Sequence, residues 1–485
     1  MAAKRRGRAE RMPGVVAAGH PESAEAGAAV LRAGGNAVDA AVGAVLASFA
    51  VESPLTGLGA GGYMAVHAHG ETTVLDFFVA APGLDGTRRT AELAPVDVVF
   101  DAETVQTFYV GPVSCGVPGT PAGLTEALRR FGSMPLEELV KPAIRLARDG
   151  APVNHEQAYI LAILAPIHGR LPGTRELYAP EGRTLREGET FRFPELAEAL
   201  ERFAAEGVVP FYRGEVAAAL SDFVVAHGGT LGRGDLAAYA AIERPPVRTR
   251  FRGTEVLTNP PPSAGGTLIV YSLDRLERLG PVSGPEQLVA AMDAANAHRA
   301  DLLGSTTHIS AVDVDGMCVA VTCSNGSGSG VLVPGTGVIL NNMLGEEDLN
   351  PGGFHMIAPG ERVPSMMSPT VVLRDGEVIL AVGSAGSNRI RSAILQTVVR
   401  VVEQGMGPQE AIAAPRLHSE AGLVQAEPGI DEAALQRLEA RGVPVARRPE
   451  INLFFGGVQA VARDPETGAL SGGGDPRRGG AVAYA

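Results

Sequence analysis

The chain has 485 residues, a globular composition without tryptophan and a formal net charge of −13. This length is roughly two to four domains' worth of chain, ample for a large hydrophobic core. The acidic balance argues against nucleic acid as a partner, because the few basic clusters are terminal, at Lys4–Arg8, or isolated.

The N-terminal segment predicts neither a signal peptide nor a membrane span. No apolar stretch follows Lys4–Arg8, and the longest apolar run, 40–51, is too short to cross a bilayer and suits a buried helix. The three cysteines have no metal spacing, and Cys318 and Cys323 are expected on opposite faces of one strand. A reduced, cytoplasmic setting is the simplest fit.

Strand and helix patterns alternate from the start of the chain. Residues 14–18 predict a strand, 21–32 an amphipathic helix, and Asn36 caps a second helix, 37–50, that is apolar on nearly all sides. The stretch 57–62 matches GxGxxG, but a proline turn precedes it and a strand pattern follows, which disfavours a dinucleotide site. A turn where backbone closely approaches its neighbours fits better.

The rest of the chain continues this mixture. The expected elements are helices over 124–131, 136–148, much of 190–240, 286–303, 390–404 and 431–441, strands over 247–258, 452–455 and 457–463, and a hairpin over 371–382. Helices and strands in this order favour stacked layers with sheets inside and helices outside.

One predicted hairpin concentrates hydroxyl groups at its open end. Its first strand runs from the hydroxyl-rich 305–307 to Asp313, Asp315-Gly316 forms the turn, and the return strand ends at 322–324. A hydroxyl is a poor nucleophile until a base takes its proton, and no Ser-His-Asp constellation surrounds this hairpin. A threonine at a chain N-terminus uses its own α-amine as the base, which here requires cleavage of the preceding peptide bond. The alternative is that these residues simply begin a β-strand, where threonine is favoured.

The chain resembles the γ-glutamyltransferases (glutathione hydrolases), a family of N-terminal-nucleophile hydrolases, over nearly its whole length. The matching segments are 34–41, 59–64, 116–120, 141–150, 260–266, 306–310, 341–342, 365–370, 383–389 and 474–477. The resemblance implies an α+β fold, a four-layer αββα sandwich. It also implies a precursor that cuts itself between Ser305 and Thr306 into a large fragment, 1–305, and a small fragment, 306–485, which stay intertwined.

The resemblance assigns the catalytic roles by position. Thr306 is the nucleophile, Ser324 orients its α-amine, and the backbone N–H groups of Gly386 and Ser387 form the oxyanion hole. Asn325 and Ser365 match substrate-binding positions, and Asn341 and Asn342 are structural neighbours of the pocket. His308 is expected to make a structural hydrogen bond, because the α-amine already supplies a base. No metal and no cofactor is needed.

Three departures from the family concern the substrate. The arginine that holds the glutamate α-carboxylate is replaced by Phe78, which favours an apolar group. The residues that receive the α-amine are replaced by Met343-Leu344-Gly345-Glu346, where Glu346 could partly substitute. The segment before Thr306 and the loop after Asn342 are short, which suggests an open pocket.

These features predict an autoprocessing γ-glutamyltransferase-like enzyme that forms an acyl-enzyme on Thr306 and transfers the acyl group to water or an amino acid. The first alternative is an acylase or amide hydrolase of the same family with a non-glutamyl acyl group. The second is an uncleaved, non-catalytic binding homologue. The expected partners are a small amide substrate and the chain's own two fragments, with no nucleic acid and no membrane.

Overall fold

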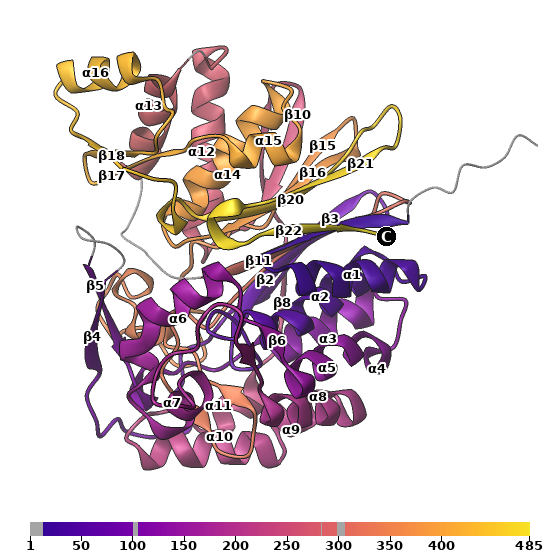
Figure 1. Ribbon diagram of the computed structural model, residues 1–485, viewed down its shortest axis with the longest axis vertical. Helices are drawn as coiled ribbons and strands as arrows, with labels where there is room; N and C mark the ends of the chain where they lie inside the picture. The colour runs from indigo at the N-terminus through magenta and orange to yellow at the C-terminus, as the bar shows by residue number, and fades with distance from the viewer. Residues whose placement is uncertain (1–12, 100–104, 283, 298–305) are drawn as a thin grey trace, which may run out of the picture.

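The computed structural model describes residues 13–99, 105–282, 284–297 and 306–485. Two antiparallel sheets pack face to face at the centre, and helices cover both outer faces (Figure 1). The first sheet has the order β22 (Ala481–Tyr484), β1 (Gly14–Ala18), β11 (Thr307–Asp313), β12 (Cys318–Ser324), β2 (Gly61–Ala68), β3 (Glu71–Phe77) and β8 (Ile242–Arg244). The second has the order β21 (Leu470–Gly474), β20 (Gly457–Arg463), β16 (Glu377–Ala385), β15 (Thr370–Arg374), β10 (Thr254–Thr258) and β9 (Val247–Phe251). The expected four-layer sandwich is therefore confirmed.

Helices divide between the two outer faces. Those beside the first sheet include α1 (Pro21–Arg32), α2 (Ala37–Val51), α3 (Thr120–Phe131), α4 (Leu136–Leu139), α5 (Lys141–Asp149) and α8 (Pro194–Glu206). Those beside the second are α12 (Ala264–Leu279), α13 (Pro285–Asn296), α14 (Arg389–Val402), α15 (Pro408–Ala413) and, farther out, α16 (Glu432–Ala440). Below the first sheet lie α6 (His155–His168), α7 (Pro172–Tyr178), α9 (Val209–Tyr212), α10 (Glu215–Ala226) and α11 (Arg233–Ala238).

Short strands complete the structure. They pair as β4 (Ala94–Val99) with β5 (Val105–Val110), β6 (Ala151–Pro152) with β7 (Thr190–Phe191), β13 (Leu332–Val333) with β14 (Val338–Ile339), and β17 (Leu417–Glu420) with β18 (Leu423–Ala426) and β19 (Val445–Arg447).

The alternation of side chains along the strands creates separate cores. In β1, Val15 and Ala17 pack between the two sheets, whereas Val16 and Ala18 pack under the helices of the first sheet. The helix α2 is buried along its whole length, as its apolar sequence predicts. The Asn36 side chain caps it by accepting the N–H groups of Val38 and Asp39 at 2.9 and 3.0 Å.

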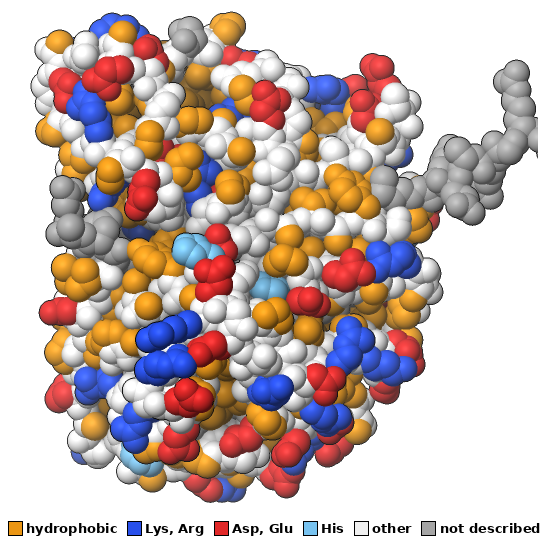
Figure 2. Space-filling view, in the orientation of Figure 1, with side chains coloured by type: hydrophobic (Ala, Val, Ile, Leu, Met, Phe, Trp, Pro, Cys, Tyr) orange, Lys and Arg blue, Asp and Glu red, His pale blue; other side chains and the backbone are white. Residues whose placement is uncertain are grey.

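Close backbone approach explains the glycine-rich stretch before β2. A Cβ at Gly59 would lie 2.0 Å from Ile339 O, and one at Gly62 would lie 2.2 Å from Thr322 O. This confirms the prediction of tight packing. Acidic and basic side chains are interspersed over the face seen in Figure 2.

Some expected elements were wrong in detail. Residues 247–258 form two strands, because Arg252 and Gly253 adopt φ values of +47° and +76° and turn the chain back on itself. Residues 136–148 are two helices divided at Val140. Leu453–Phe455 is a 3₁₀ turn and not a strand. The helix expected over 286–303 is α13, which ends at Asn296, and the end of the expected range lies outside the described residues.

Candidate active site

Thr306 lies at the start of a central strand. Thr306 directly precedes β11, which lies between β1 and β12, and this residue is only 2% exposed. The β11–β12 register pairs Thr307 with Cys323 and so brings Thr306 opposite Ser324. Ser324 is fully buried and accepts the N–H of Gly326 on Oγ at 2.7 Å. The two hydroxyl-bearing strand ends therefore meet, as the hairpin prediction requires. Ser305, the other half of the predicted cleavage site, lies outside the described residues.

The predicted oxyanion loop follows β16 of the second sheet. Gly386 and Ser387 have φ values of +117° and +60°, and a Cβ at Gly386 would lie 2.5 Å from Gly456 Cα, so this position requires glycine. Asn388 donates from Nδ2 to Glu420 Oε1 at 2.7 Å and ties the loop to β17. The helix α14 begins at the next residue, and its Ile390 lines the same pocket as Thr306.

His308 fixes the two sheets against each other. Its Nδ1 is 2.7 Å from Thr322 Oγ1 and its Nε2 is 3.0 Å from Ser310 Oγ, so both ring nitrogens are engaged. Burial lowers the pKa of His308 to about 3 and keeps the ring neutral. A Cβ at Gly383 would lie 2.2 Å from the ring. The side chain therefore acts as a structural contact between β11 and β16.

The pocket at Thr306 is small, apolar and uncharged. The space inside the pocket and at its open mouth together amounts to about 220 Å³. Its walls are Phe78, Thr306, Met343, Leu349, Ser365, Met366, Met367 and Ile390. Among the described residues of these walls, Thr306 and Ser365 are the polar ones, and both bring hydroxyls. We call this space the acyl pocket.

Phe78 is held rigidly in the acyl pocket. Its ring stacks on Tyr63 with 5.4 Å between centroids, its N–H donates to Asp76 Oδ1 at 2.9 Å, and its carbonyl accepts Tyr239 Oη at 2.7 Å. Asp76 is in turn paired with Arg244 Nε at 2.7 Å and Arg362 Nε at 3.2 Å. These cations are therefore committed to Asp76, and Phe78 lines the same pocket as Thr306.

Two predicted substrate-binding residues lie outside the walls of the acyl pocket. Glu346 accepts the N–H of Ser327 at 2.8 Å, and burial raises the pKa of its carboxyl to about 8. Asn342 donates to Ser327 Oγ at 2.7 Å, and neither side-chain atom of Asn325 has a partner among the described residues. These polar groups form a buried cluster, while Met343 contributes the wall itself.

Sequence reasoning missed Glu52, a buried carboxylate beside Thr307. Its Oε2 accepts Thr307 Oγ1 at 2.5 Å and its Oε1 accepts Ser23 Oγ at 3.1 Å. Burial raises the pKa of Glu52 to about 7, while both hydroxyls and Arg478 hold it down. A carboxylate directly after a largely apolar helix was the available signal, but its partner Thr307 lies far away in sequence.

Three other features of the described residues bear on function. No group of three or more His, Cys, Asp or Glu side chains there could hold a metal ion. The three cysteines are free and buried. No helix in the same residues is both long and apolar enough to cross a bilayer.

Comparison with known proteins gives consistent matches along the chain. The sequence profile of the gamma-glutamyltranspeptidase family matches residues 23–305 and 284–485. The acylase ACY 1 proenzyme of Pseudomonas sp. strain SE83 is 34% identical, over 95% of this chain and 91% of that protein. The glutathione hydrolase proenzyme of Escherichia coli K12 is 32% identical, over 96% and 90%. The crystal structure of cephalosporin acylase from Bacillus halodurans superposes with a TM-score of 0.85 at 27% identity, over 99% and 97%.

Proposed function

Because the chain belongs to the gamma-glutamyltranspeptidase family, we propose that it is a precursor that cuts itself between Ser305 and Thr306. The mature enzyme then hydrolyses or transfers the acyl group of an amide substrate. The order of the first sheet supports lasting association of the fragments 1–305 and 306–485, because β11 and β12 of the small fragment lie between β1 and β2 of the large one.

The same threonine acts in both stages. In maturation, Thr306 Oγ attacks the carbonyl of Ser305 and the C–N bond breaks, which frees the α-amine and leaves Ser305 as an ester on Oγ. Water then hydrolyses this ester and releases the Thr306 hydroxyl and the Ser305 carboxylate. In turnover, this amine takes the Oγ proton, Oγ attacks the amide carbonyl, and the leaving amine takes the proton. Ser324, opposite Thr306, orients the α-amine. The N–H groups of Gly386 and Ser387 stabilise the oxyanion, a contribution of about 2.7–4 kcal/mol for a donor in other hydrolases.

The observation that carries this proposal is the buried Thr306 at a strand end, opposite Ser324 and open to the acyl pocket. The test is the intact mass of wild type beside Thr306→Ala. We expect two fragments, 1–305 and 306–485, from wild type and one chain from the variant. A wild type that stays whole has no free α-amine on Thr306, and the non-catalytic alternative then replaces the enzyme.

The acyl group is a separate question. Family membership supports a γ-glutamyl or related amide, but the acyl pocket favours a group without an α-carboxylate. None of the described wall residues is charged, and Phe78 stands where the family places its arginine. Loss of a charge-assisted hydrogen bond weakens carboxylate binding by about 1.5–3 kcal/mol.

Matched chromogenic amides distinguish the two acyl groups. The purified enzyme is given γ-glutamyl p-nitroanilide and a short aliphatic acyl p-nitroanilide, and kcat/KM is compared. We expect the aliphatic amide to be preferred. A preference for the γ-glutamyl amide would assign the enzyme to glutathione-type substrates and leave the Thr306 mechanism intact.

A further inference from the structure

The end of β11 that carries Thr306 is supported on one side only. The pairing of β1 with β11 ends at Ala18 opposite Ile309, whereas the pairing of β12 with β11 continues to Cys323 opposite Thr307. Among the described residues, Thr307 therefore pairs with β12 and not with β1. A strand end with one neighbour has fewer backbone hydrogen bonds, so its side-chain contacts decide how firmly it is held.

One side-chain contact holds Thr307 from the helix side of the first sheet. Thr307 Oγ1 donates to Glu52 Oε2 at 2.5 Å. Ser23 Oγ, which belongs to α1, donates to the other carboxyl oxygen, Glu52 Oε1, at 3.1 Å. The carboxyl of Glu52 therefore joins the start of β11 to a helix that covers the sheet.

The backbone of Glu52 is itself fixed. Glu52 is the C-cap of α2, and its N–H donates to Ser48 O at 2.7 Å. Its carbonyl oxygen accepts the N–H groups of Leu55 and Thr56 at 2.8 and 3.3 Å. A short side chain on a backbone held in this way gives the carboxyl a defined position.

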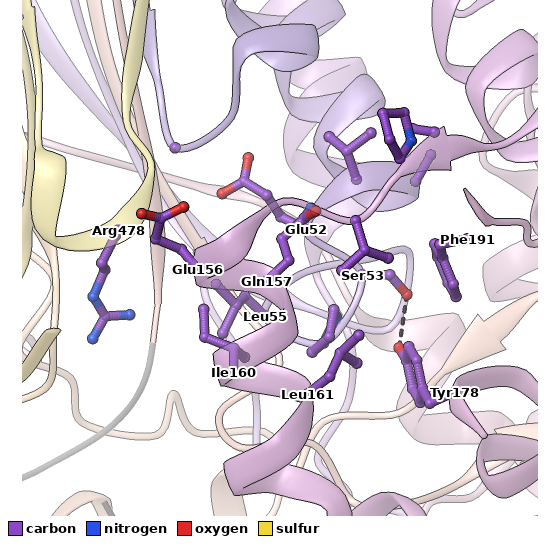
Figure 3. A pocket seen from close by; sticks show the side chains of 17 residues that line it. Glu52, Ser53, Leu55, Glu156, Gln157, Ile160, Leu161, Tyr178, Phe191 and Arg478 are labelled. Atoms are coloured by element: carbon purple, nitrogen blue, oxygen red, sulfur yellow. Dashed lines mark hydrogen bonds between the residues drawn. The ribbon is translucent and has the colours of Figure 1, made fainter. Parts of the chain in front are cut away.

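Two further charged side chains lie around Glu52. It lines the pocket drawn in Figure 3 together with Glu156 and Arg478. In the described part of the chain neither of them is within ion-pair distance of Glu52, and the hydrogen-bond partners of its carboxyl are the hydroxyls of Thr307 and Ser23. Removal of one hydroxyl therefore tests one contact.

Glycine at position 19 makes room for the contact between Glu52 and Thr307. A Cβ at Gly19 would lie 2.3 Å from Glu52 Oε2 and 3.1 Å from Thr307 Oγ1. Gly19 directly follows β1, at the point where the pairing of β1 with β11 stops. The Glu52 carboxyl thus contacts β11 just beyond the last residue that β1 supports.

We propose that Glu52 is a positioning residue for the mature nucleophile and that it acts through Thr307. This rests on the proposed function. Because side chains alternate along a strand, Thr307 points toward Glu52 while Thr306 points to the opposite side, where it lines the acyl pocket. Self-cleavage makes Thr306 a chain end that is bonded to the fold only through Thr307. The position of Thr307 therefore sets where the Thr306 hydroxyl and α-amine lie.

This anchor matters more after cleavage than before it. In the precursor the peptide bond to Ser305 also restrains Thr306, whereas a free chain end frays unless it is tied down. A displacement of about 1 Å between reacting groups lowers the rate of the chemical step by up to about 10²-fold. We therefore expect loss of the anchor to lower kcat and to leave KM and self-cleavage nearly unchanged.

Steady-state kinetics of the processed enzyme with the short aliphatic acyl p-nitroanilide measure this effect. Thr307→Val removes the hydroxyl and keeps the shape of the side chain, so kcat should fall about tenfold with KM within about twofold of wild type. Thr307→Ser retains a hydroxyl and should keep most of kcat. Glu52→Leu should resemble Thr307→Val, and the double variant should be no worse than either, because both changes remove the same contact.

Ser23→Ala is the matched control. It removes the other hydroxyl from the same carboxyl and leaves the contact with Thr307 in place. It should lower the urea midpoint about as much as Thr307→Val does, with kcat within about twofold of wild type. Equal losses of kcat in the two variants, or an unchanged kcat in Thr307→Val, would overturn the proposal.

A second variant covers the case in which Thr307→Val does not fold. Gly19→Ala keeps both partners and presses a methyl group against the Glu52 carboxyl. Its kcat should fall with little change in KM, and a wild-type kcat in Gly19→Ala would refute the positioning role.

The intact mass of each protein separates the two kinds of failure. A wild type that stays whole refutes the proposed function, and this proposal with it. Complete cleavage in all variants, with an unchanged kcat in Thr307→Val, refutes the positioning role alone. Variants that stay whole beside a cleaved wild type would assign the contact to maturation and refute its stated role in the mature enzyme.

Discussion

Glu52 makes the stability of the protein depend on pH in a direction that the structure specifies. Its carboxyl is 5% exposed and accepts the hydroxyls of Thr307 and Ser23. Burial raises its pKa from 4.5 to about 7. The folded state therefore holds this proton more tightly than the unfolded chain, and the resulting stabilisation is fully present below about pH 4.5 and lost as the pH rises to about 7.

The size of the effect follows from the two pKa values. The difference between 4.5 and about 7 corresponds to about 3 kcal/mol of unfolding free energy, of which about 2–3 kcal/mol is lost between pH 5 and pH 8. A glutamine at this position accepts one hydroxyl on its carbonyl oxygen, donates from its NH₂ to the other hydroxyl oxygen, and cannot ionise. We therefore expect Glu52→Gln to be about 2–3 kcal/mol less sensitive to this change of pH than wild type.

Urea unfolding at pH 5 and pH 8 measures this difference. Glu52→Gln is compared with its parent, and both carry Thr306→Ala, so that a single uncut chain unfolds. The exposed Glu137→Gln, made in the same parent, serves as the matched control. The control should follow the Thr306→Ala parent at both values of pH. Parallel behaviour of Glu52→Gln and its parent would mean that the folded protein does not perturb this carboxyl, and the argument from burial would be wrong.

Three further predictions concern the acyl pocket and the loops around it. Phe78→Arg should raise kcat/KM for γ-glutamyl p-nitroanilide relative to the aliphatic amide by about 10–100-fold, as one charge-assisted contact allows; an unchanged ratio would exclude control by this side chain. Asn388→Ala removes the hydrogen bond to Glu420 and should lower kcat about tenfold with little change in KM, because the loop position affects the oxyanion; a change confined to KM would contradict this. Gly383→Ala would place a methyl group 2.2 Å from the ring of His308 and should abolish soluble folded protein, whereas Gly407→Ala, at a negative φ and with open space around it, should be far milder.

Local patterns predicted the elements whose signals are themselves local. The cap of α2 by Asn36 and the β11–β12 hairpin both depend on residues close in sequence, and both are confirmed. The division of 247–258 into β9 and β10 escaped detection, because apolar alternation continues through the turn and Arg252 is not a typical residue at positive φ. The contact between Glu52 and Thr307 joins distant segments, and no periodicity in one sequence contains it. The assignment of Thr306 as nucleophile needed the resemblance to a family.

The site separates what builds the catalytic geometry from what selects the substrate. The geometry depends on backbone: the register of β11 and β12, the positive φ of Gly386, and glycine at 383 against His308. The acyl pocket depends on the side chains that line it, such as Phe78 and Met343. Substitution of a glycine that sets the backbone disturbs the packing of the two sheets, whereas substitution of a wall residue changes which acyl groups fit the pocket. This difference explains how one fold serves relatives named as glutathione hydrolases and as acylases. It also means that the family alone does not determine the acyl group, which has to be inferred from the residues that line the pocket.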